Sequence, residues 1–88
     1  MKEFIQALEL GGRWVFTYYY YNNLIATPAE GIREVTDMPH EIHIDLENGG
    51  YCVLSKDGKV SMEKGEDDLI SFEFKYDECI ITVDKVGD

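Results

Sequence analysis

The chain has 88 residues, of which 44% are hydrophobic and 30% are charged, and its eighteen acidic and eight basic residues give a net charge of −10. A chain of this length is expected to fold as a single domain over residues 1–88. Its negative charge repels phosphate groups, which argues against direct nucleic-acid binding and against attachment to anionic membranes.

Residues 2–10 are predicted to form a short amphipathic helix. Phe4, Ile5 and Leu8 fall on one stripe, and the polar residues between them face outward. Gly11 follows as a stop signal, because glycine reaches the left-handed conformation without a steric clash. A helix this short is marginal on its own, so we expect its apolar stripe to dock on a sheet.

Residues 13–21 are aromatic and β-branched and are predicted to form a strand with two apolar faces. We expect this strand to be central in the sheet or covered on both sides. Asn22 and Asn23 tolerate positive φ angles, so they are expected to turn the chain into residues 24–26.

Residues 27–38 give conflicting signals. Thr27, Pro28 and Glu30 have the spacing of a helix start, but few residues remain before Pro39. Ile32 and Val35 fit a helical turn as well as a strand, and of these alternatives we expect a short helix or an irregular turn here.

From residue 41 onward, apolar and polar residues alternate and turn signals divide the chain. Asp57-Gly58 is the strongest hairpin signal, because a two-residue type I′ turn needs two positive φ angles. Residues 65–68 are predicted to form a polar loop. The predicted strands cover residues 41–47, 51–55, 59–63, 69–76 and 79–84.

Together these elements predict an α+β fold. We expect a twisted antiparallel β meander of five or six strands, with the N-terminal helix packed on one face. The other face is polar along residues 41–47 and 59–63 and is acidic.

Catalytic and metal-binding patterns are weak in this sequence, which predicts no enzyme, no cofactor and no metal site. Cys52 and Cys79 lie in apolar strand runs, where a thiol behaves as a small hydrophobic group. Two cysteines make no disulfide framework, and no apolar run is long enough for a membrane helix, so we expect a cytoplasmic protein. The alternative is a small-ligand or catalytic domain that uses Cys52, Cys79 or His43.

The charge pattern predicts a non-enzymatic interaction protein that binds a basic protein partner. Carboxylates on the polar sheet face supply the charge, and tyrosines supply large rings that tolerate water. In a narrower version of this hypothesis the carboxylates imitate a nucleic-acid backbone and inhibit a basic protein. A structural homodimer, paired through a strand edge or the tyrosine face, is the other alternative. The predicted partner-binding residues are Tyr19, Tyr21, Glu41, His43, Asp45 and Glu47.

Overall fold

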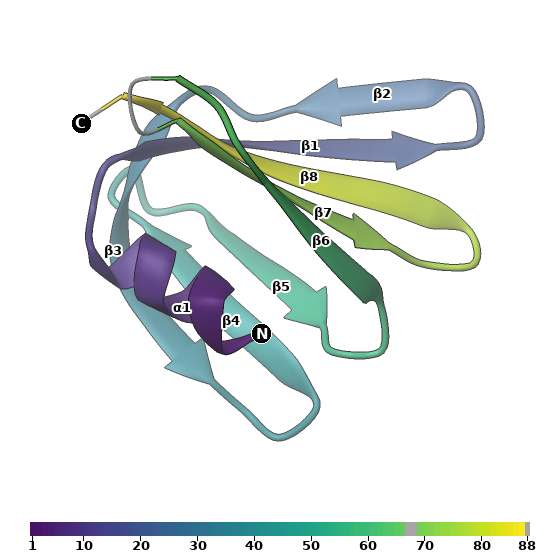
Figure 1. The fold of residues 1–88 in the computed structure, drawn as a ribbon, viewed down its shortest axis with the longest axis horizontal. Helices are drawn as coiled ribbons and strands as arrows, with labels where there is room; N and C mark the ends of the chain where they lie inside the picture. The colour runs from purple at the N-terminus through teal and green to yellow at the C-terminus, as the bar shows by residue number, and fades with distance from the viewer. Residues whose placement is uncertain (67–68, 88) are drawn as a thin grey trace.

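The computed structural model describes residues 1–66 and 69–87, and Figure 1 shows one short helix beside a strongly curved sheet. The predicted polar loop at residues 65–68 lies partly outside this described part. The helix is α1 (Lys2–Glu9). The described strands are β1 (Arg13–Tyr20), β2 (Asn23–Ala26), β3 (Glu30–Asp37), β4 (Glu41–Leu46), β5 (Tyr51–Ser55), β6 (Lys59–Lys64), β7 (Ile70–Lys75) and β8 (Cys79–Gly87).

The strands lie in the order β5-β4-β3-β1-β8-β7-β6, and β2 pairs with β1. All of the pairings are antiparallel. Strands β3–β4–β5 and β6–β7–β8 are two three-stranded meanders, and β1 lies between them. Only Arg13 and Trp14 of β1 pair with β3, whose register with β4 shifts between Ile32 and Glu34. This narrow junction lets the two halves of the sheet lie at a steep angle to each other (Figure 1).

The hydrophobic core fills the space between α1 and the concave side of the curved sheet. Phe4 of α1 packs edge-to-face on Phe72 and Phe74 of β7, with ring centroids 5.0 and 4.8 Å apart. Trp14 is fully buried, and its indole N–H donates to the carbonyl of Gly11, 3.2 Å away. The predicted docking of an amphipathic N-terminal helix on one sheet face is thus confirmed. Nowhere in the described residues is there a helix of the length and apolarity that a membrane crossing requires.

The prediction of a short helix or irregular turn at residues 27–38 was wrong, because β3 occupies most of this segment. Thr27 does not cap a helix. Its hydroxyl accepts a hydrogen bond from the Phe16 amide at 3.0 Å, and its own amide donates to the Phe16 carbonyl at 2.9 Å. Pairing with β4 over residues 32–37 provides hydrogen-bond partners for backbone N–H and C=O groups that in a helix would have bonded within the helix itself.

The α+β class is confirmed, but the prediction of five or six strands is too low. The described residues form an eight-stranded sheet, because β3 was missed and β2 is a strand of its own. The predicted single meander is also interrupted, since the first strand pairs with the last. Asp57-Gly58 does turn the chain, but β5 and β6 do not pair there. They form opposite ends of the strand order, so the turn carries the chain from one half of the sheet to the other.

The hairpin of β1 and β2 projects at one margin of the molecule (Figure 1). Its two-residue turn is Tyr21-Asn22, and the positive φ falls on Tyr21 (52°), not on an asparagine as the sequence suggested. β2 lies beside β1 as a strand and leaves Tyr19 uncovered at 40% exposure. The expectation that β1 is central is confirmed, since it has strands on both sides.

Candidate functional site

The strict alternation of β4 separates an apolar side from a polar side. Ile42, Ile44 and Leu46 are buried in the core. Glu41, His43 and Asp45 alternate with them and therefore point to the outer, convex side of the sheet. This division matches the predicted one, and it follows from the period-2 geometry of a strand that is buried on one side.

Neighbouring strands extend this polar side into a continuous surface. Glu34 of β3 lies opposite Asp45, and Asp45 in turn lies opposite Tyr51 of β5. One row across three strands therefore holds two carboxylates and a tyrosine that is 66% exposed. We call this surface the acidic face, and it consists of Glu34, Glu41, His43, Asp45, Tyr51 and Val53.

Basic groups offset part of the charge of this surface. Arg33 Nη2 lies 3.7 Å from Asp45 Oδ1, and Lys56 pairs with Asp37 at the edge of the surface. His43 Nε2 lies 2.7 Å from Glu41 Oε1, a distance that fits an N–H donating to the carboxylate. Because Glu34 and Asp45 are like charges directly opposite each other, Arg33 lowers a repulsion that the sheet would otherwise carry. Glu34 is exposed.

Glu47 belongs to the end of this region, not to its centre. Its amide donates to the carbonyl of Gly31 at 3.1 Å, and its side chain lies over Gly31, where a Cβ would come within 2.5 Å of the carboxyl carbon. Glu47 therefore follows β4 at the start of the turn into β5, close to the start of β3.

Tyr19 and Tyr21, predicted as aromatic anchors, lie on the β1–β2 hairpin and not among the carboxylates of β4. Tyr19 pairs across the sheet with Leu24 and Ile80, and Tyr21 packs edge-to-face on Tyr20 with ring centroids 4.4 Å apart. The structure thus divides the predicted site between two surfaces. The aromatic residue of the acidic face is instead Tyr51, which lies opposite Asp45 in the pairing of β4 with β5 and was not among the predicted site residues.

Cys52 and His43 lie on opposite sides of the sheet. Cys52 lies opposite Ile44 and therefore faces inward, whereas His43 lies opposite Val53 and faces outward. Burial raises the pKa of the Cys52 thiol, which lowers its thiolate fraction and its nucleophilicity. Within residues 1–66 and 69–87, no group of three or more His, Cys, Asp or Glu residues is placed to hold a metal ion.

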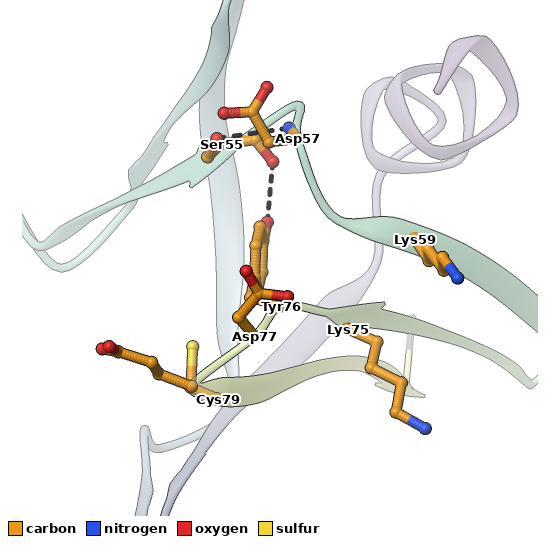
Figure 2. Close-up of a pocket in the computed structure, with 8 residues that line it drawn as sticks. Ser55, Asp57, Lys59, Lys75, Tyr76, Asp77 and Cys79 are labelled. Atoms are coloured by element: carbon orange, nitrogen blue, oxygen red, sulfur yellow. Dashed lines mark hydrogen bonds between the residues drawn. The ribbon is translucent and has the colours of Figure 1, made fainter.

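The second cysteine, Cys79, lies at the rim of an open hollow where the β5–β6 and β7–β8 turns meet (Figure 2). The Tyr76 side chain extends across this region, and its hydroxyl donates a hydrogen bond to the Ser55 carbonyl at 2.7 Å. Burial, followed by the nearby Cys79 and Asp57, raises the pKa of Tyr76. Both signs of charge mix around the hollow, which gives no electrostatic preference for one ligand class. Its lining residues are Ser55, Asp57, Lys59, Lys75, Tyr76, Asp77, Glu78 and Cys79.

We compared the chain with protein-family models, with curated proteins and with solved structures, and none of the three comparisons found a match.

Proposed function

We propose that this protein is a non-enzymatic interaction protein that binds a basic protein partner through the acidic face. The observation that supports the proposal is the row formed by Glu34, Asp45 and Tyr51, in which two carboxylates adjoin an exposed aromatic ring. Carboxylates attract Lys and Arg side chains, and tyrosine supplies apolar contact area at little entropic cost.

The polar residues of β6 and β7 offer a useful contrast. Glu63 and Glu73 also lie on the outer side of the sheet, but β6 and β7 are at the opposite end of the strand order from β4. Lys59 and Lys75 lie opposite each other on that same outer side. Carboxylates there are mixed with basic groups and have no exposed tyrosine in the same row, so we assign binding to the acidic face alone.

The test is affinity capture from native cell lysate at low and high salt, with identification by mass spectrometry. We expect a basic protein that is retained at low salt and released at high salt, since the Debye length falls from ~30 Å at 0.01 M to ~3 Å at 1 M. The double substitution Glu41→Lys and Asp45→Lys should abolish capture. The matched control, Glu63→Lys with Glu73→Lys, changes the total charge by the same amount. It should still capture most of the partner that the wild-type protein captures. Equal loss in both variants would show that net charge, and not this face, attracts the partner.

The narrower form of the proposal is that the acidic face imitates nucleic acid. Residues two apart on a strand are ~6.8 Å apart, twice the ~3.4 Å charge spacing of one DNA strand. If the partner uses its nucleic-acid groove, duplex DNA added to the captured complex should displace it. If duplex DNA does not displace the partner at low salt, the proposal of a basic partner stands but nucleic-acid mimicry is rejected.

The proposed compartment is the cytoplasm. Cys52 and Cys79 are both free, which suits a reducing environment that keeps thiols unpaired. Fractionation of the native cells with an antibody against the protein tests this directly.

A further inference from the structure

The β1–β2 hairpin carries the longest uncharged stretch of this highly charged chain. Residues 14–29 contain no Asp, Glu, Lys, Arg or His. Apolar side chains project from both sides of the hairpin, with Leu24 59% exposed and Ile25 64% exposed. Leu24 shares the outer side with Tyr19, and Ile25 shares the inner side with Tyr18, as their pairing requires. This region therefore differs in chemistry from the acidic face.

The register of the hairpin shows which backbone groups point away from β1. Tyr20 and Asn23 close the two-residue turn, and the Thr27 amide donates to the Phe16 carbonyl at 2.9 Å. Residues 23, 25 and 27 therefore direct their N–H and C=O groups toward β1, because hydrogen-bonded and non-hydrogen-bonded pairs alternate. Leu24 and Ala26 direct theirs outward. Among the described residues β2 pairs with β1 alone, and Figure 1 shows β2 along the margin of the molecule.

β5 and β6, at the two ends of the strand order, also have an unpaired outer edge, but each has a feature that opposes pairing with a second copy. β6 carries Lys59, Glu63 and Lys64, and charges of this kind discourage strand pairing. β5 is uncharged, but its outward residues belong to the acidic face, so a second acidic copy paired there would lie close to Glu41 and Asp45. β2 has no charged residue of its own and none on the part of β1 with which it pairs.

We propose that β2 is the pairing edge of a homodimer, in which β2 of one copy adds antiparallel to β2 of a second copy. Each copy carries a net charge of −10, and association through the neutral hairpin places no like charges within the contact itself. A second copy also presents the same outward pattern of backbone groups, which makes the edge self-complementary about a two-fold axis. The acidic face is not involved, so this inference stands independently of the proposed function.

One register uses all of the outward backbone groups of Leu24 and Ala26. The two-fold axis passes beside Ile25, so that Ile25 lies opposite Ile25 of the partner subunit as a non-hydrogen-bonded pair. Leu24 then lies opposite Ala26 of the partner subunit, and the two exchange both of their hydrogen bonds. The result is a sheet that continues from one subunit into the next, with the Ile25 side chains in contact across the axis.

The first experiment is sedimentation velocity of the full chain over a concentration series. We expect a reversible shift from the 10.1 kDa monomer to a species of twice that mass. Ile25→Lys and Ile25→Glu should each be monomeric, because each places like charges opposite each other at the axis. An equimolar mixture of the two variants should dimerise again. Val53→Lys, a similar change at an exposed position of β5, should leave the dimer intact.

Cysteine substitution tests the register itself. Non-hydrogen-bonded partners have Cα atoms ~4.5 Å apart, which suits a disulfide bond. Ile25→Cys should therefore oxidise to a covalent dimer faster than Leu24→Cys, which lies out of register with its own copy. A wild-type sample tests for crosslinking through Cys52 or Cys79.

Three results would overturn the proposal. They are a wild-type chain that stays monomeric at every concentration, a dimer that persists in both Ile25 charge variants, and equal crosslinking at positions 24 and 25. Hydrogen exchange adds a readout for each residue, since the Leu24 and Ala26 amides should become protected as the dimer forms. If they are protected only when a foreign peptide is added to a monomeric chain, the edge takes another protein's strand and the second copy is excluded.

Discussion

The Tyr76 hydroxyl donates a 2.7 Å hydrogen bond to the main-chain carbonyl of Ser55. Ser55 ends β5 at one limit of the strand order, and Tyr76 directly follows β7 near the other limit. One side chain therefore links the two halves of the sheet beside the turn from β5 to β6. We expect Tyr76→Phe to lower the free energy of unfolding by about 1 kcal/mol, the usual net value of one hydrogen bond. Tyr51→Phe, at an exposed ring, is the control and should change it little in a denaturant titration.

Gly58 allows the Tyr76 ring to take this position. A Cβ on Gly58 would lie 2.6 Å from a ring carbon of Tyr76, so Gly58→Ala forces the ring and its hydroxyl away from Ser55. We expect a loss of stability of roughly 1–3 kcal/mol, the range for overpacked sites. At Gly65 the nearest side-chain atom would lie 3.6 Å from an added Cβ, which is ordinary contact. Thermal unfolding of Gly58→Ala beside Gly65→Ala measures the difference, and equal midpoints would contradict this account.

Docking of α1 depends on Phe4, which is 1% exposed and contacts two rings of β7. Phe4→Ala should cost roughly 3–5 kcal/mol, a large part of the stability of a small domain. Phe4→Leu should cost less and keeps the protein measurable if the alanine variant unfolds. Leu10→Ala, at a residue 87% exposed, should change stability by less than about 0.5 kcal/mol. If Phe4→Leu lowered the free energy of unfolding in urea no more than Leu10→Ala does, the helix would not be anchored through Phe4.

Cys52 should respond to pH as a thiol held neutral by burial. Its raised pKa means that the folded state binds the proton more tightly than the unfolded state. This contribution to stability is fully present below the ordinary thiol pKa of ~8.5 and is lost as the pH rises through the folded value. Cys52→Ala should therefore weaken the decline of stability on the alkaline side. An unchanged pH profile between pH 8 and 10 would argue against this role.

Reactivity of the same thiol separates the interaction hypothesis from the catalytic alternative. Alkylation of folded Cys52 at pH 8 should be slower than that of a free small thiol and should accelerate when the chain is unfolded in denaturant. Mass spectrometry after a timed iodoacetamide pulse distinguishes Cys52 from Cys79. A fast reaction at Cys52 in the folded chain would revive the catalytic alternative.

Strands that are buried on one side could be predicted from the sequence because their side-chain period is a local property. The alternation along β4 places Ile42 and Ile44 in the core and Glu41 and Asp45 outside, as found. The stripe of Phe4 and Leu8 likewise predicted a docked helix. β3 was missed because Thr27 and Pro28 have the local features of a helix start. Its backbone is satisfied instead by β4, through pairing that a reading of local propensities does not weigh.

For the acidic face and the β1–β2 hairpin, too, some features could be predicted from the sequence and others depend on which strands pair. The amino-acid sequence alone shows which side chains of β4 face outward, that Glu41 and Asp45 among them are acidic, and that residues 14–29 are uncharged, because composition and alternation are properties of the chain. Strand pairing was needed to show that Tyr51, and not Tyr19, lies beside Asp45, and that β5 and β6 separate at Gly58. Which strands become neighbours depends on burial and hydrogen bonding between segments far apart in the chain, since local preferences are compatible with several pairings.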